Sequence, residues 1–123
     1  MTCIDAKVVV DSYQLSLLIF KISKNFSKHY RPTLGRRLED GSINLTLFVR
    51  VASLASGKNR SSRRVIFLEK SSECLDEIRI LLQICHDLQI IPISTYGEIS
   101  EATSTVGRQI GSFFKSVQTG DTL

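Results

Sequence analysis

Residues that could support catalysis or metal binding are few and widely spaced in this sequence. The dipeptide Gly57-Lys58 resembles part of a phosphate-binding loop. That motif also needs Gly at position 52, Ser or Thr at position 59 and a preceding strand, whereas the chain has Ala52 and Asn59. His29 and His86 each lack a second ligand four residues away, so no zinc site is expected. The sequence therefore predicts no metal site and no bound cofactor.

Acidic residues and cysteines give no catalytic pattern either. The neighbours Asp76 and Glu77 point about 100° apart on a helix, and Asp76 with Arg79 fits a surface pair three residues apart. Cys74 and Cys85 lie eleven residues apart on one expected helix, about 16 Å, which is too far for a disulfide. Unpaired thiols indicate a reducing cytoplasmic location. We expect no catalytic residue, and hence a protein that is not an enzyme.

The charge distribution is more informative. The net charge is +4, but residues 1–68 hold 12 Lys and Arg against 4 Asp and Glu, whereas residues 69–123 hold 4 against 8. This asymmetry predicts an anionic partner such as RNA or DNA. The nucleic-acid-binding candidates are Lys21, Lys24, Lys28, Arg31, Arg36 and Arg37 around one expected turn, and Lys58, Arg60, Arg63 and Arg64 around the next. The alternative is a positive surface that only keeps the protein soluble.

The first of these two groups is the stronger candidate. Arg36 and Arg37 are expected near the start of a helix, where positive charge opposes the helix dipole, so a role in stability is a poor explanation for them. Few aromatic residues accompany the basic ones, so we expect phosphate contacts with weak sequence selectivity and a steep salt dependence.

Four segments with apolar residues at helical spacing must position these charges. The spacing predicts helices near residues 11–28, 33–55, 62–89 and 95–117, with Asp11 as the first N-cap and a polar tail at 118–123. An apolar period near 3.5 and short connections predict an all-α, antiparallel up-down four-helix bundle that forms a single domain over residues 1–123. Its predicted centre is Leu45, Phe48, Ile78, Leu81, Val106 and Ile110. No apolar run reaches the roughly 18 to 20 residues of a membrane span, so we expect no membrane association.

Two of the predicted helices carry a second apolar stripe on the side away from the core. Its members are Ile43, Leu47 and Leu54 on the second helix and Ile80, Ile84 and Ile91 on the third. Opposed stripes on neighbouring helices predict an interface between copies of the chain. The alternative is a wide core that wraps each helix. A separate pair of small residues, Gly107 and Gly111, is expected to let another helix approach the fourth one closely.

Several short motifs follow one another at a distinctive spacing. They are Phe26, Lys28, Arg31 and Thr33-Leu34-Gly35, then Leu75-Asp76, Arg79, Leu82, Asp87-Leu88, Ile93-Ser94, Tyr96 and residues 107–113. In their order and spacing, over about residues 15–117, they resemble the bacterial four-helix bundle protein family. That family includes proteins encoded in intervening sequences of ribosomal RNA genes and the accessory variability determinants of diversity-generating retroelements. The chain departs from the family pattern at Ser27, Pro32 and Phe113, where Pro, an aromatic residue and Trp are usual.

In the retroelement branch, the resemblance implies a basic, pentameric protein without enzymatic activity. Such a protein associates with the reverse transcriptase of the element and with nucleic acid, and supports mutagenic copying of a template RNA. We therefore expect a cytoplasmic accessory protein that assembles into a homo-oligomeric ring. The alternatives are an intervening-sequence bundle protein of unknown role, and a small structural bundle that binds no nucleic acid. An enzyme or metal-binding bundle would need inward-facing carboxylates or histidines, which the predicted seams lack.

Overall fold

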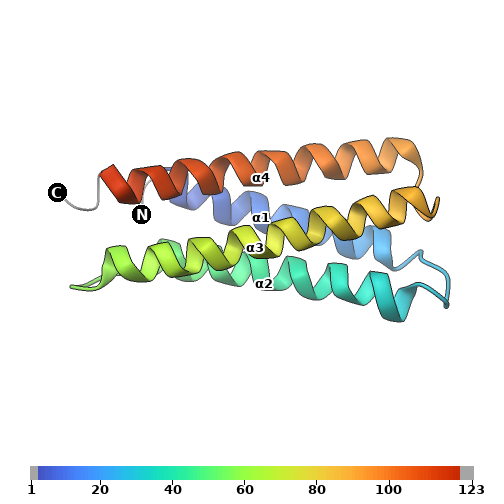
Figure 1. The fold of residues 1–123 in the computed structure, drawn as a ribbon, viewed down its shortest axis with the longest axis horizontal. Coiled ribbons are helices and arrows are strands. Elements are labelled where there is room, and N and C mark those ends of the chain that lie inside the picture. The colour runs from blue at the N-terminus through green and yellow to red at the C-terminus, as the bar shows by residue number, and fades with distance from the viewer. Residues whose placement is uncertain (1–2, 120–123) are drawn as a thin grey trace.

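Four helices account for almost the whole chain in the structure, a computed structural model that describes residues 3–119. They are α1 (Cys3–Ser23), α2 (Arg36–Leu54), α3 (Arg60–Asp87) and α4 (Ile93–Thr119), and a π-helical turn η1 (Arg31–Gly35) precedes α2. Successive helices run antiparallel, and each packs against two neighbours, so that α1 closes the bundle by contacting α4 (Figure 1). No strand occurs between residues 3 and 119. The predicted all-α class and four-helix bundle are confirmed.

The core contains most of the residues that the apolar spacing predicts. Leu45, Ile78, Leu81, Val106 and Ile110 are buried among residues from all four helices. The prediction for Phe48 is wrong. Its ring is only half-buried and lies at the boundary with α3, with its centroid 5.9 Å from that of Phe67. The fully buried residue here is Val49, four positions after buried Leu45 and three before buried Ala52, so the seam of α2 differs from the predicted one at this position.

The first helix departs most from its predicted bounds. It begins at Cys3 rather than near residue 11, and it ends at Ser23 rather than near residue 28. Asp11 therefore lies inside the helix, where its Oδ2 is 3.5 Å from Lys7 Nζ and accepts a hydrogen bond of 2.6 Å from Gln109 Nε2. This carboxylate joins α1 to α4 instead of capping α1. Residues 118 and 119, predicted as tail, continue α4, and residues 120–123 lie outside the described part of the chain.

The turn between α1 and α2 is tightly built. Phe26 folds back into the core, and a Cβ at Gly35 would lie 3.4 Å from its Cδ2, so the two pack in contact. The Gly35 N–H donates to the Tyr30 carbonyl at 3.1 Å, which gives the wide π-helical turn that leads into α2. The basic residues of this region are thus attached to an ordered backbone.

The other two turns each contain a residue in the left-handed region. Gly57, between α2 and α3, has φ 87°, and Gln89, just after α3, has φ 58°. The N–H groups of Gln89 and Ile90 donate to the carbonyls of His86 and Cys85 at 3.0 and 2.9 Å. This is the hydrogen-bond pattern of a Schellman motif, in which Gly usually occupies the position of Gln89.

Candidate nucleic-acid interface

The two predicted basic groups lie at opposite ends of the bundle. The first surrounds the connection of α1 to α2, at the end where α3 also connects to α4 (Figure 1). The second surrounds the connection of α2 to α3, at the end that holds the termini (Figure 1). One chain therefore presents two separate basic regions rather than one continuous surface.

Five members of the first group are open to solvent. They are Lys21 in the last turn of α1, Lys24 and Lys28 in the connection that follows, Arg31 in η1 and Arg36 at the start of α2. The ion pairs found among residues 3–119 involve none of these five. They form a set of cations that remains available to an anionic ligand, and we call them the first-turn cations.

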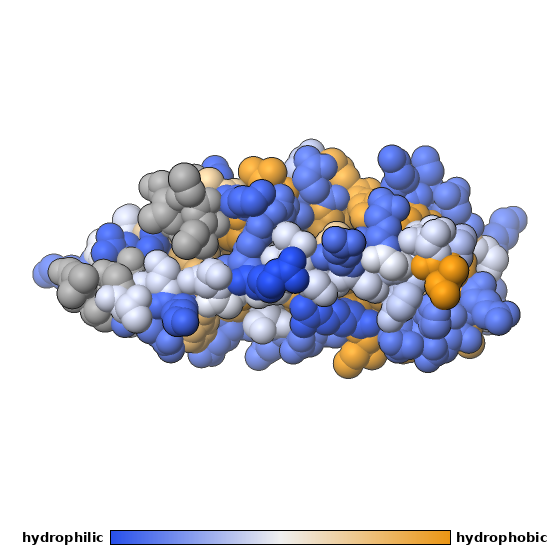
Figure 2. All heavy atoms as spheres, turned by 90° about the horizontal axis from the view of Figure 1, so that it is seen from above, coloured by the Kyte–Doolittle hydropathy of each residue, from blue (hydrophilic) through white to orange (hydrophobic). Residues whose placement is uncertain are grey.

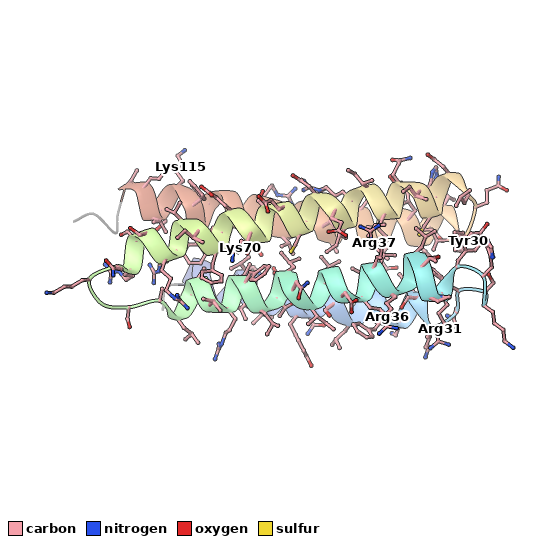
Figure 3. The ribbon with its side chains drawn as sticks, turned by 60° about the horizontal axis from the view of Figure 1, so that its bottom comes forward. Tyr30, Arg31, Arg36, Arg37, Lys70 and Lys115 are labelled. Carbon is pink, nitrogen blue, oxygen red and sulfur yellow. The ribbon has the colours of Figure 1, made fainter. Side chains whose placement is uncertain are left out.

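Arg37 lies apart from its predicted partners. Its Nη2 is 3.1 Å from Glu77 Oε1, so this arginine bridges α2 to α3. Figure 3 shows Arg37 reaching toward α3, whereas Arg31 and Arg36 lie together on the other side of α2. Adjacent helix residues point about 100° apart, which is why Arg36 and Arg37 cannot serve one surface equally.

Some members of the second group contact other residues of the bundle. Arg64 is half-buried, its Nε donates to the Ala52 carbonyl at 3.2 Å, and its guanidinium carbon lies 5.5 Å from the centroid of the Phe113 ring. It thereby satisfies a carbonyl in the last turn of α2, so its guanidinium is partly engaged within the bundle, and its role in nucleic-acid binding stays a prediction. Lys58 and Arg60 are exposed, and the guanidinium carbon of Arg63 lies 4.9 Å from the centroid of the Phe67 ring.

Lys70 extends this second group, although the sequence analysis did not include it. Its Nζ lies 4.9 Å from the ring centroid of Phe67 and 5.6 Å from that of Phe48, between α2 and α3 (Figure 3). The sequence signal was its spacing of three residues from Phe67, which places both side chains on one side of α3. Together, Arg63, Lys70 and the two rings form a cation–π cluster on the α2–α3 surface.

The predicted apolar stripes are exposed on the single chain, with one exception. Ile43, Leu47 and Leu54 on α2 and Ile80 and Ile84 on α3 are exposed, so they do not belong to a widened core. Ile91 is only 6% exposed and packs in the core, so its assignment to the interface is wrong. The physical reason is that α3 ends at Asp87, and the connection that follows turns Ile91 inward.

A third stripe, on α1, was missed by the sequence analysis. Its members Val10, Tyr13, Leu17 and Phe20 are exposed and recur every three or four residues. The Ser16 and Ser42 hydroxyls are 3.1 Å apart, which fixes the register between the antiparallel helices α1 and α2. In this register the α1 stripe lies at the same height along the bundle as Ile43 and Leu47. We call these six residues the α1–α2 face. In Figure 2, apolar atoms collect along the edge of the molecule that α1 forms, whereas the surface of α4 is mostly polar.

Other reactive groups do not gather into a site. No group of three His, Cys, Asp or Glu side chains that could hold a metal ion is found within residues 3–119. Burial raises the pKa of the Cys85 thiol to about 11, and burial followed by nearby Glu77 and Glu73 raises the pKa of Cys74, so both remain protonated at neutral pH. Hydrogen bonds from His86, and then from Gln83, lower the pKa of Asp87.

Comparison with known proteins gives no match for this chain. No protein-family model matches the chain, and none of the curated proteins matches it. Within the described residues, no helix has the length and apolar character needed to cross a bilayer.

Proposed function

We propose that this bundle is a non-enzymatic accessory protein that binds nucleic acid beside a reverse transcriptase, as its resemblance to the accessory variability determinants of diversity-generating retroelements implies. The observation that carries the nucleic-acid part is the set of first-turn cations, which are exposed and form no ion pair within the described chain. Cations without intramolecular partners can replace the counterions of a phosphate backbone, and their release drives binding.

This binding relies on phosphates rather than on bases. Tyr30, the neighbour of Arg31, is half-buried with its ring centroid 4.8 Å from that of His29. Such a ring is a poor platform for stacking successive bases. If all five first-turn cations engage a single-stranded RNA, log K should fall with log salt at a slope of about −3.5.

Self-association belongs to the same proposal. The α1–α2 face consists of six exposed apolar or aromatic residues, and Ile80 and Ile84 are a second exposed apolar pair on α3. A closed ring uses two different surfaces of each subunit, and these two meet that requirement. A ring, pentameric as the resemblance implies, would repeat the first-turn cations around its axis and multiply their contacts with one strand.

The nucleic-acid proposal is tested by reversing charge at two first-turn positions. Fluorescence anisotropy with a labelled RNA hairpin, at two salt concentrations, should show that Arg31→Glu with Arg36→Glu weakens binding by about tenfold or more and flattens the salt dependence. Lys7→Glu with Arg50→Glu makes the same change in net charge elsewhere and should leave binding nearly unchanged. Equal losses in both double variants would show that only overall charge matters.

The partner is tested separately. A reverse transcriptase gene with paired template and variable repeats beside this gene would support the retroelement role, and the purified enzyme should then retain this protein in a pull-down. A wild-type protein that binds no RNA at low salt would leave the structural-bundle alternative in place.

A further inference from the structure

A groove between α3 and α4 gathers most of the positive charge of the acidic half of the chain. Residues 69–123 contain four basic residues, and three of them, Arg79, Arg108 and Lys115, line this groove. The fourth, Lys70, belongs to the cation–π cluster on the other side of α3. Because this half of the chain has 8 acidic residues against 4 basic ones, the collection of three cations along one groove calls for an explanation.

The groove has the shape of a binding site. A cavity of about 390 Å³ is lined by Ser72, Leu75 and Arg79 of α3 and by Ser104, Gly107, Arg108 and Ile110 of α4. An adjoining hollow of about 370 Å³ shares Ser72, Gly107 and Ile110 with the first and extends to Lys115, where Glu69 of α3 also lines it. Hydroxyl and guanidinium groups thus stand over an apolar floor, a combination that is common in sites for small ligands.

Arg79 reaches α4 because residue 107 has no side chain. A Cβ at Gly107 would lie 2.5 Å from Arg79 Nη2 and 3.3 Å from Leu75 Cδ2. The guanidinium of an α3 residue therefore rests directly against the backbone of α4. At Gly111, one turn further along, a Cβ would meet nothing within 4 Å, so only the first glycine of the pair receives a close neighbour.

Neither arginine is fully used within the protein. Arg79 Nη1 is 3.5 Å from Asp76 Oδ1, a long contact between two exposed side chains, and Arg108 Nη2 donates to Thr105 Oγ1 at 3.3 Å. A guanidinium carries five N–H donors, so most of the hydrogen-bonding capacity of both arginines remains open. The Ser72 and Ser104 hydroxyls on the two walls add neutral donors.

We propose that this groove binds a compact phosphate-bearing anion, such as a diphosphate group, between Arg79 of α3 and Arg108 of α4. Arginine matches phosphate oxygens with paired N–H donors, and two guanidinium groups lining one cavity favour an anion with several charged oxygens over a single carboxylate. Lys115 lies seven residues, about 10 Å, beyond Arg108 and would meet an extension of the ligand along the groove. The site lies away from both basic ends and does not depend on the proposed function.

The two glycines provide a matched pair of test variants. Isothermal titration calorimetry of the full chain with inorganic pyrophosphate should show saturable binding to one site. Gly107→Ala leaves the net charge unchanged but displaces the Arg79 guanidinium, and should weaken binding by about tenfold, the loss expected for one charge-assisted contact. Gly111→Ala makes the same chemical change where there is open space, and should bind as the wild type does.

Substitution of the arginines tests whether a loss of pyrophosphate binding comes from the site itself rather than from a change in folding stability. Arg79→Gln and Arg108→Gln alter exposed side chains, so both should keep the wild-type melting curve while each weakens pyrophosphate binding by about tenfold. Arg36→Glu, at the first turn, should not affect it. Absence of saturable binding to the wild type, or equal affinities for Gly107→Ala and Gly111→Ala, would overturn the proposal.

The source of the phosphate is distinguished by three ligands. Tighter binding of a nucleoside diphosphate than of pyrophosphate would support the groove as a nucleotide site, and equal affinities would support recognition of the diphosphate alone. Binding of a short oligonucleotide with none of pyrophosphate would contradict a compact anion, because the groove would then be an extension of the nucleic-acid surface.

Discussion

The outward surfaces of α1 and α4 differ sharply, although the two helices lie side by side and both pack against the same core. Outside, α1 presents Val10, Tyr13, Leu17 and Phe20, whereas α4 presents mostly charged and small polar residues, among them Glu101, Ser104, Arg108 and Lys115. A helix in a bundle needs only one apolar stripe to fold. Apart from exposed Ile93 at its start, the large apolar residues of α4 are confined to the one stripe that folding requires, so the second apolar stripe of α1 indicates contact with another molecule.

The largest expected effect tests whether the inward sides of the two helices are equivalent. Leu15 on α1 and Ile110 on α4 are both buried in the core. Leu15→Ala and Ile110→Ala should each lower the free energy of unfolding by about 2 to 5 kcal/mol, measured by denaturant titration followed by circular dichroism. A small cost for Leu15→Ala alone would mean that α1 is held mainly by something other than this core.

A negative charge placed on the outward side should have different effects on α1 and α4. Leu17 is 48% exposed, and Leu17→Glu should lower the order of the oligomer while leaving helicity intact, because a carboxylate would be buried in the contact between copies. Ser112→Glu, on the exposed side of α4, serves as the matched control and should change nothing. Light scattering coupled to gel filtration measures both. A wild-type protein that elutes as a monomer would refute self-association.

A smaller effect is expected at the connection that holds α4 against α3. Gln89 adopts φ 58° there, a region that costs a residue with a Cβ more than it costs Gly. Gln89→Gly should raise the free energy of unfolding by about 1 kcal/mol. If thermal denaturation shows a loss of stability instead, the side chain of Gln89 contributes a contact that outweighs the backbone strain.

The smallest effect concerns the acid dependence of the same connection. The pKa of Asp87 is lowered by hydrogen bonds from His86 and Gln83, so its contribution is present above the ordinary pKa of Asp and is lost as pH falls through the lower folded value. Asp87→Asn should make stability slightly less sensitive to pH between about pH 5 and pH 2 than in the wild type. Parallel pH dependences in chemical denaturation would show that Asp87 contributes nothing.

The period of the apolar residues was enough to predict the bundle, but it could not fix the rotation of each helix. Phe48 and Val49 are adjacent and both apolar, so only packing against α3 decides that Val49 enters the core. The start of α1 was missed because Val8, Val9 and Val10 are β-branched, which favours an extended chain until burial of Val8 outweighs that preference. The misplaced start removed only Val10 from the outer stripe, since Tyr13, Leu17 and Phe20 all lie within the predicted helix.

The sequence predicted which basic residues surround the candidate site, but not which way their side chains point. Runs of Lys and Arg locate the basic ends, but the surroundings of each arginine decide its contacts. Arg37 meets a carboxylate, Arg64 meets a backbone carbonyl, and Arg36 is open to solvent. The groove between α3 and α4 brings together residues that are distant in the chain. The spacing of Gly107 and Gly111 predicted a close approach to α4, but not that the residue entering at Gly107 is Arg79.

The placement of positive charge at both tips of a rod limits how the protein can hold a long polymer. α3 has 28 residues and is therefore about 42 Å long, which matches roughly 12 base pairs of a duplex laid along it. A short hairpin gripped at one tip cannot reach the other. A longer strand, or two separate ones, can occupy both, so at low protein concentration each rod acts as a crosslink between distant segments. When protein is in excess, each segment of nucleic acid can bind a separate protein molecule, so the crosslinks should be lost.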